Sequence, residues 1–284
     1  MKDFRFDLDI ILKTLDIPAQ YLARETGLEP ASVSGWLKGS YLPDPRSMET
    51  VYGYAYRQGL RINEAHEGPY RDLCEKNGLK LLFHGAREPF REEADICHSK
   101  QNNDLGTGFY CGETFLQSAG FVSGYRGSCV YSYGLDLKGL KVYEYEMGLE
   151  WALTIAANRG LLDRYRESSV LKGVLSGPKG SDVMIAPIAN NRMFDIIAEF
   201  SEGMISGNAC VHLLAALDLG RQYVIKTDRA MKRMGLLRQF YLCREEKESD
   251  LERMRNSQRE RYEKSSDFRS RYRKGQYIEE ILYE

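Results

Sequence analysis

Three side chains stand at positions in this chain where they could act on a ligand. His84 ends an apolar run, LLFHGA, and Gly85 follows it at once. Tyr110 closes a glycine-rich segment, NNDLGTGFY, and Gln222 begins the run RQYVIKT. A tyrosine ring stacks on flat ligands, and a carboxamide forms hydrogen bonds but cannot serve as a base. Taken singly, a strand-end histidine, a loop tyrosine and a polar residue at a strand start are weak signals of function.

Each signal also has a structural explanation when it is taken singly. A histidine at a strand end is usually a structural histidine, and a GxGFY segment is usually a turn with a core aromatic. Asp104 could cap the loop, since Asx side chains commonly bond nearby backbone amides. Asp182, Asn190 and Arg192 could line a pocket, although a buried strand and a helix cap explain them nearly as well. The order of the segments along the chain favours the functional interpretation.

Five segments together resemble the ADP-ribosyltransferase superfamily. They are FHG (83–85), NDLGTGFY (103–110), EW…NR (150–159), DVMIAPIANNR (182–192) and QYVIKT (222–227). The histidine-tyrosine-glutamate branch, which includes the poly(ADP-ribose) polymerases, has HG on its first strand, a GxGxY-type segment on its second and a later strand with its glutamate. The chain looks closer to a bacterial group of unknown function within that superfamily, in which glutamine is typical at the glutamate position. The resemblance covers residues 79–243.

The resemblance implies an NAD-dependent mono-ADP-ribosyltransferase, with NAD as substrate, nicotinamide as leaving group and no metal. The implied catalytic residues are His84, Tyr110 and Gln222. His84 would hydrogen-bond a ribose hydroxyl, the Gly85 backbone would hold the carboxamide, and the Tyr110 ring would lie on the nicotinamide. Stacking and cation–π attraction on that flat cation are worth about 0.5–2 kcal/mol each. The residues implied to contact NAD are His84, Gly85, Asn103, Asp104, Gly106, Gly108, Phe109, Tyr110, Asp182, Asn190 and Arg192.

The glycines of the 103–110 segment have a conformational role in this interpretation. Gly106 and Gly108 would let the loop adopt positive φ and bring its backbone close to the ligand. They would thereby shape the loop that aims Tyr110.

Gln222 stands where the polymerases carry glutamate. Breaking the bond to nicotinamide develops positive charge on the ribose, which a carboxylate would stabilise. Glutamine predicts a slower reaction, a single transfer, or an acceptor that needs no deprotonation. An NAD-sensing regulator without turnover and an NAD glycohydrolase both stay open. The acceptor, protein or nucleic acid, is not named by the sequence, and a role as toxin or phage-defence effector is an expectation by analogy.

The secondary structure expected around these residues indicates a mixed α+β domain over residues 79–243. Apolar and β-branched runs predict six strands, and helical periodicity predicts helices between them. The strand runs are LKLLFHGA, CVYSYGLD, LKVYEYE, SDVMIAPIA, RQYVIKT and LRQFYLC. Residues 67–78 are expected to be a linker with a helical turn.

Residues 1–66 predict a small all-α domain. Pro18 and Pro30 suit first helical positions, and Gly27 and Gly39 suit left-handed caps. The stretch IPAQYLARETGLEPASVSGWLKG resembles repressor-like helix-turn-helix domains, and we expect it to fold alone.

The resemblance places base contacts of such a domain on Gln20, Ser32, Ser34 and Lys38. Residues 1–66 nevertheless hold 8 basic and 9 acidic side chains. Because phosphate contacts supply sequence-independent affinity, random DNA should bind weakly. DNA binding and a protein-docking or dimerising role both stay open, as does oligomerisation of the chain.

Residues 244–284 predict a charged tail, helical or partly disordered. Acids lead and bases follow, as a helix dipole favours. Between Arg253 and Lys274 lie 9 basic and 3 acidic residues, with Tyr262, Phe268 and Tyr272 interleaved. A nucleic-acid contact is one interpretation of this stretch, and a solvated helix face is the other.

The overall composition excludes several classes of partner. The net charge is −1, from 40 basic and 41 acidic residues, which gives no global reason for nucleic-acid or anionic-membrane binding. No run approaches the roughly 18 apolar residues of a spanning helix, and the start lacks a basic leader. Six cysteines without CxxC spacing and four dispersed histidines do not favour zinc, so we expect reduced thiols and a cytoplasmic protein.

Overall fold

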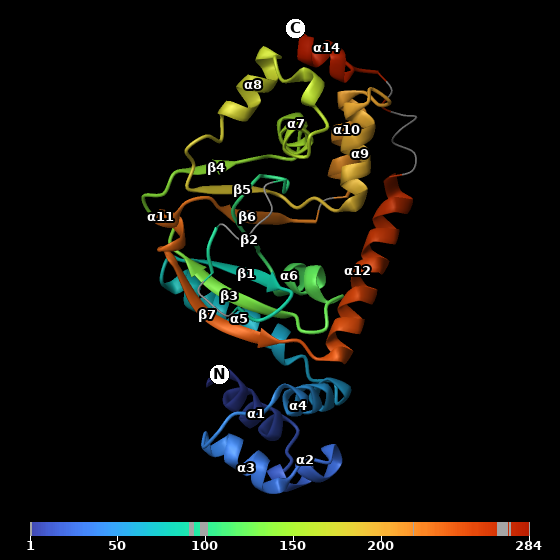
Figure 1. Cartoon of the computed structure of the whole chain (residues 1–284). Coiled ribbons are helices and arrows are strands. Elements are labelled where there is room, and N and C mark those ends of the chain that lie inside the picture. The colour runs from blue at the N-terminus through green and yellow to red at the C-terminus, as the bar shows by residue number, and fades with distance from the viewer. Residues whose placement is uncertain are drawn as a thin grey trace. The chain divides into compact units, whose positions relative to one another are not determined.

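The computed structural model describes residues 2–90, 94–96, 102–217, 219–265, 272 and 274–283. The chain divides into two compact units, each assembled from segments that are distant in the sequence. The first unit is built from Met1–Arg91, Thr114–Leu135 and Gly235–Met254, and the second from Glu92–Glu113, Asp136–Met234 and Arg255–Glu284. Helices and strands occur in both, so the predicted mixed α+β class is confirmed (Figure 1).

The first unit begins with five helices. They are α1 (Lys2–Thr14), α2 (Ala19–Thr26), α3 (Pro30–Lys38), α4 (Pro45–Arg57) and α5 (Ile62–Lys76). Gly27 and Gly39 end α2 and α3 at φ 67° and 73°, the left-handed conformation that glycine adopts without strain. Pro30 is the first residue of α3, whereas Pro18 is the cap before α2. Residues 67–76, expected to be a linker, belong to α5, which continues through Pro69.

The core of these helices extends beyond residue 66. Cys243 is buried among Leu8, Leu22 and Trp36, and Tyr241 packs against the same cluster. A buried carboxylate adds a polar connection. Asp7 accepts hydrogen bonds from Tyr52 and His66 at 2.6 and 2.7 Å, and it also pairs with buried Arg238. Such a charge is stable inside a protein only when it is paired, so residues 1–66 in isolation would lack a partner that Asp7 requires.

The remainder of the first unit is a sheet with helices packed on it. Its strands are β1 (Lys80–Ala86), β3 (Cys129–Leu135) and β7 (Met234–Tyr241), in the order β1-β3-β7. β1 and β3 are antiparallel, with His84 opposite Tyr131. Helix α6 (Phe115–Val122) begins with a capping box at Thr114 and packs on the sheet. Phe83, Phe115 and Phe240 are the largest side chains of this core.

The second unit contains four adjacent strands, in the order β4-β5-β6-β2. Its strands are β2 (Phe109–Gly112), β4 (Val142–Glu144), β5 (Val183–Pro187) and β6 (Arg221–Ile225). β6 is antiparallel to both β2 and β5, and β4 is parallel to β5. The helices are α7 (Leu149–Asn158), α8 (Ser169–Ser176), α9 (Asn191–Ser201), α10 (Gly207–Ala215) and α11 (Asp228–Met231), with a 3-10 turn at Asp163–Tyr165. The hydrophobic core that contains Trp151 is built from side chains of β5, β6 and helices α7, α9 and α10, among others.

The C-terminal residues form two further helices, α12 (Arg244–Ser265) and α14 (Ile278–Tyr283). α14 is part of the core of the second unit, because Ile278 and Leu282 are buried in its hydrophobic cluster. Ser206 donates a hydrogen bond to the Tyr272 carbonyl, and the Tyr272 ring stacks on His212 at 3.8 Å. Phe268 and the Tyr262 side chain lie outside the described residues. The end of the tail is therefore folded, and the apolar residues of the segment YIEEILY could have indicated this.

No helix in the described part of the chain is long and apolar enough to cross a membrane.

Candidate functional site

The predicted loop tyrosine lies on a strand. Tyr110 is the second residue of β2, and its hydroxyl turns back onto the preceding segment. The hydroxyl donates to the Gly106 carbonyl at 2.6 Å and accepts from the Leu105 amide at 3.1 Å. Burial raises the pKa of the Tyr110 hydroxyl well above its ordinary value. The hydroxyl therefore shapes the 103–108 segment, which we call the glycine loop, and the half-buried ring remains the part suited to contact a ligand.

The two glycines of the loop serve different purposes. Gly106 has φ +73°, the left-handed conformation expected of it. Gly108 does not have positive φ, and its role is close packing. A Cβ at Gly108 would lie 2.6 Å from Val224 Cγ1 and 2.8 Å from the Ile225 carbonyl oxygen. The backbone at Gly108 thus lies against β6.

Three side chains from outside the glycine loop hold it in place. Lys226, just after β6, donates to the Leu105 carbonyl at 2.7 Å and also to that of Thr107. Asn158 donates to the Asp104 carbonyl at 2.8 Å, and Arg159 pairs with the Asp104 carboxylate at 2.6 Å. Burial raises the pKa of Asp104 and the Arg159 pair opposes that effect. Asp104 is therefore an anchor of the loop, held by Arg159 at the end of α7.

Tyr110 and Gln222 lie on the same face of the sheet. Cross-strand partners share a face, and β2 pairs with β6 so that Tyr110 is opposite Val224 and Gly112 is opposite Gln222. Val224 and Gln222 are two residues apart, so Gln222 is the diagonal neighbour of Tyr110. The Gln222 side chain is buried, and its Nε2 donates to the Pro187 carbonyl at 2.9 Å. The two cross-strand partners of Gln222 are both small, Gly112 on β2 and Ala186 on β5.

His84 and Gly85 lie in the first unit, on β1. The His84 ring stacks on Phe90 with centroids 5.4 Å apart, and Phe90 stacks on Tyr131 at 4.6 Å. Close packing explains the glycine at position 85, because a Cβ there would collide with the Ser118 carbonyl of α6. The HG pair is thus built into the sheet and helix of the first unit, while Tyr110 and Gln222 belong to the second.

The remaining predicted ligand residues have local structural partners. Asp182 is buried and accepts from the Lys141 amide at 2.8 Å and the Thr227 hydroxyl at 2.8 Å; these bonds hold its pKa below the ordinary value. Asn190 caps α9 by accepting from the Met193 amide at 2.9 Å. Arg192, half-buried in α9, pairs with Asp195 at 3.5 Å. Asn103 is half-buried in the glycine loop and Phe109 is buried on the face of β2 opposite Tyr110.

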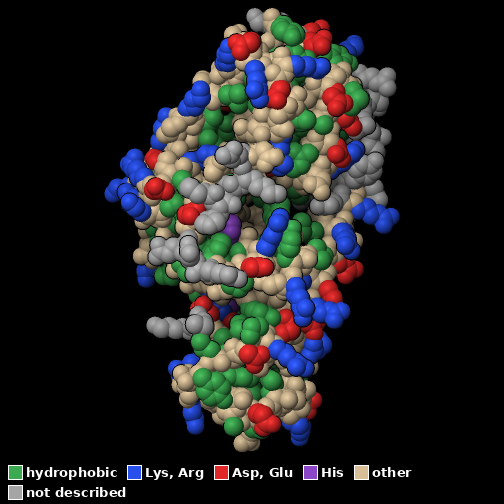
Figure 2. All heavy atoms as spheres, viewed as in Figure 1, with side chains coloured by type: hydrophobic (Ala, Val, Ile, Leu, Met, Phe, Trp, Pro, Cys, Tyr) green, Lys and Arg blue, Asp and Glu red, His purple; other side chains and the backbone are tan. Residues whose placement is uncertain are grey.

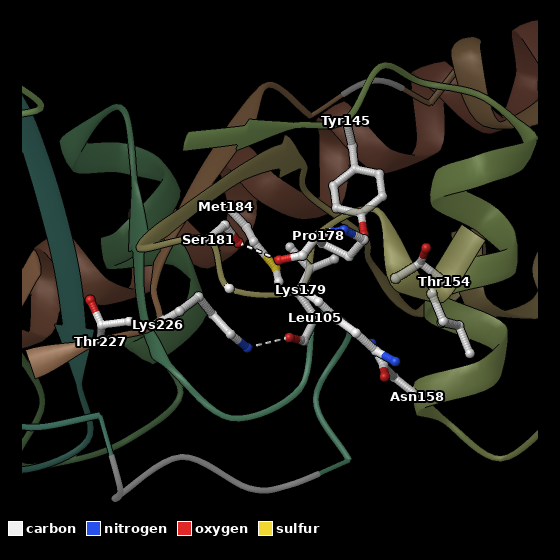
Figure 3. A pocket seen from close by; sticks show the side chains of 12 residues that line it. Leu105, Tyr145, Thr154, Asn158, Pro178, Lys179, Ser181, Met184, Lys226 and Thr227 are labelled. Carbon is white, nitrogen blue, oxygen red and sulfur yellow. Dashed lines mark hydrogen bonds between the residues drawn. The ribbon is translucent and has the colours of Figure 1, made fainter. Parts of the chain in front are cut away.

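A pocket of about 400 Å³ lies in the second unit beside the glycine loop (Figure 3). We call it the lysine pocket; its lining includes Leu105, Tyr145, Lys179, Ser181, Met184 and Lys226. None of the three implied catalytic residues lines it. Sequence reasoning missed Lys226, whose side chain reaches both the pocket and the loop. The sequence signal that could have identified Lys226 was a charged residue directly after the strand run RQYVI.

The candidate nucleic-acid residues lie on α2 and α3. Gln20 and Lys38 are exposed, and Ser32 and Ser34 are half-buried. Large exposed hydrophobic side chains of the same helical region include Phe6, Tyr21, Tyr41 and Leu42. Hydrophobic side chains are visible on this region in Figure 2. This composition, like the charge balance, leaves protein docking open beside DNA binding.

Among the described residues, no group of three or more His, Cys, Asp or Glu side chains is placed to hold a metal ion. The five described cysteines, which exclude Cys97, are free and buried. Burial raises the pKa of the Cys210 thiol to about 12, so this thiol is not a poised nucleophile.

Residues 80–236, more than half of the 284-residue chain, match a family model described as "Protein of unknown function (DUF3990)". The chain belongs to this family. The DUF3990 match begins at β1 and ends within β7, so it contains His84, the glycine loop and Gln222. It leaves out helices α1 to α5 and the C-terminal helices. Comparison with curated proteins and with solved structures gave no match.

Proposed function

We propose that this DUF3990 protein is an NAD-dependent mono-ADP-ribosyltransferase that transfers ADP-ribose to a macromolecule. The observation that carries the proposal is the placement of Tyr110 and Gln222 as diagonal neighbours on one face of β2 and β6. In that arrangement the Tyr110 ring would contact the nicotinamide of NAD, and the buried Gln222 carboxamide would contact the attached ribose. The order of the five sequence segments supports the same assignment.

The glycine loop supports the proposal through preorganisation. Tyr110 can hold a ring only if its own position is fixed before the ligand arrives. Its hydroxyl is bonded to Leu105 and Gly106, and the loop is bonded in turn by Lys226. Because the Tyr110 pKa is raised far above neutrality, the residue acts by stacking and not as a general base.

Gln222 would stabilise the developing charge through its carbonyl oxygen. The donation from Nε2 to Pro187 fixes which end of the carboxamide is the acceptor. A hydrogen bond from a ribose hydroxyl to Oε1 would place a partial negative charge beside the oxocarbenium-like ribose. This interaction is weaker than that of a carboxylate, so a low rate and a single transfer are expected. The His84 imidazole, by resemblance, contributes a hydrogen bond to NAD.

The deciding experiment measures nicotinamide release from NAD by the full chain, with and without cell lysate. We expect Gln222→Ala to lower turnover more than NAD affinity, which marks an interaction stronger in the transition state. Gln222→Glu keeps the shape but loses the donation to the Pro187 carbonyl, and where the new carboxylate is ionised it should raise NAD hydrolysis. Gln239→Ala, a half-buried glutamine on β7, is the matched control and should change neither quantity.

Three outcomes separate the alternatives. Label transferred from NAD to lysate macromolecules supports the transferase. Nicotinamide release without label transfer indicates an NAD glycohydrolase. NAD binding with no release by the wild type, with Gln222 substitutions altering affinity alone, indicates a sensor and ends the enzyme proposal.

A further inference from the structure

The lysine pocket lies on the same face of the sheet as Tyr110 and Gln222, because its lining residue Met184 is the β5 partner of Val224, but neither Tyr110 nor Gln222 lines it. Its volume of about 400 Å³ falls in the range of small-molecule sites. Met184 and Leu175 supply apolar walls, and Thr154, Asn158 and Ser181 supply polar groups. Such a mixture suits a ligand that has a flat apolar ring bearing a few polar atoms.

Tyr145 provides an independent indication that the pocket takes a ligand. The side chain is 1% exposed, and its buried hydroxyl makes no hydrogen bond of ordinary geometry among the described residues, with the Thr154 hydroxyl as its polar neighbour. Figure 3 shows the ring projecting among the lining side chains with the hydroxyl foremost. The nearby Thr154 hydroxyl already donates to the Glu150 carbonyl at 2.8 Å. A buried hydroxyl left unpaired is unfavourable, and a ligand atom in the pocket would satisfy it.

The charges around the pocket are positive. Lys179 is exposed at its rim, and Lys226 uses two of its three ammonium hydrogens on loop carbonyls. Lys141 donates to the Lys179 carbonyl at 3.1 Å, which places a third ammonium group close by. The neighbouring carboxylate, Asp182, is already held by backbone and side-chain donors. Figure 2 shows further basic side chains gathered over α11.

We propose that the lysine pocket binds a phosphate monoester of mononucleotide size, with its ring beside Tyr145 and its phosphate at Lys179 and Lys226. Two or three ammonium groups match the double charge of a monoester. The ring atoms would pair with the Tyr145 hydroxyl and the polar groups beside it. The pocket adjoins the proposed NAD contacts, since Leu105 lines it and bonds the Tyr110 hydroxyl, but the nucleotide assignment does not depend on NAD binding.

Calorimetry on the full chain tests the site with the four 5′-nucleoside monophosphates, the four nucleosides and inorganic phosphate. We expect at least one monophosphate to bind at least roughly tenfold more tightly than its nucleoside, as loss of charged phosphate contacts requires. Lys179→Ala should raise the Kd of that nucleotide roughly 3- to 10-fold and leave nucleoside binding unchanged. Tyr145→Phe should raise the Kd of nucleotide and nucleoside alike, by roughly 2- to 10-fold. Lys172→Ala, an exposed lysine paired with Glu167, is the control and should have no effect.

Two further comparisons make the result decisive. His84→Ala removes an implied NAD contact in the first unit, outside the pocket lining, and should leave nucleotide binding intact, so a failed NAD proposal does not remove this one. A 5′-phosphorylated oligonucleotide, titrated in parallel, tells a free nucleotide from a nucleic-acid end by which of the two binds more tightly. No binding of any monophosphate at millimolar concentration, or binding that is equal in wild type, Lys179→Ala and Tyr145→Phe, would overturn the proposal.

Discussion

Substituting Tyr110 by phenylalanine separates the two functions assigned to this residue. The substitution keeps the ring but removes the hydroxyl that bonds Gly106 and Leu105. Leu105 is 2% exposed, so its amide would be left buried without the Tyr110 acceptor. An unsatisfied buried group costs about 1–3 kcal/mol, and we expect Tyr110→Phe to destabilise the second unit by that amount.

The assay is urea unfolding followed by tryptophan fluorescence. The chain has two tryptophans, Trp36 in the first unit and Trp151 in the second, and Trp151 is fully buried. In a Trp36→Phe background the signal reports on the second unit alone. Tyr143→Phe is the matched control, because the Tyr143 hydroxyl bonds an exposed carboxylate, that of Glu150, and its loss should cost less than about 1 kcal/mol.

The same variants test how the ring acts on NAD. Folded Tyr110→Ala loses stacking and should bind NAD more weakly by roughly 1–2 kcal/mol, whereas Tyr110→Phe should lose less. The reasoning about the loop is refuted if the urea midpoint of unfolding of Tyr110→Phe equals that of the wild type. The reasoning about NAD is refuted if calorimetry gives folded Tyr110→Ala the wild-type affinity.

Two further predictions concern stability. Gly106→Ala places a side chain at φ +73° and should cost about 1–2 kcal/mol, with Gly106→Asn costing less; Gly108→Ala should cost about 1–3 kcal/mol by collision with Val224. Equal urea midpoints for both Gly106 variants would contradict the conformational argument. Burial, helped by Asp250, raises the pKa of Glu246 to about 8, so the folded state keeps a proton that the unfolded state loses near its ordinary value of 4.5. Stability of the first unit should therefore fall as pH rises from about 6 to 8, by up to about 1.4 kcal/mol per pH unit, and Glu246→Gln should remove the slope in that range, which lies above the raised pKa of Asp250, about 6; an unchanged slope in the variant would show the assignment wrong.

Much of the local structure could be predicted from the sequence. Apolar runs with β-branched and aromatic residues located β1, β3, β4, β5, β6 and β7, because strand patterning is a property of a few consecutive residues. Gly27 and Gly39 were recognisable as helix ends for the same reason, and Gly106 as a position of positive φ. β2 was missed as a strand, since four residues within a glycine-rich segment carry too short a pattern. The mixed α+β class follows from these elements and was confirmed.

The contacts that shape the candidate site could not be predicted, because they join residues far apart in the chain. Lys226 reaches Leu105 across 121 positions, and Arg159 reaches Asp104 across 55. Nothing in the local pattern of either residue names its partner, since the partner depends on which strand becomes the neighbour. The same holds for Asp7 and Arg238, 231 positions apart, whose pairing ties the N-terminal helices to β7.

The sequence by itself determined which residue types were available: a histidine beside glycine, a tyrosine beyond two glycines, and a glutamine at a strand start. Only the tertiary structure decided that Tyr110 and Gln222 share a face, that Asp104 and Lys226 hold the loop, and that Gly108 serves packing. Side-chain type and backbone preference act over a few residues, whereas strand register and buried ion pairs arise when distant segments exclude water together.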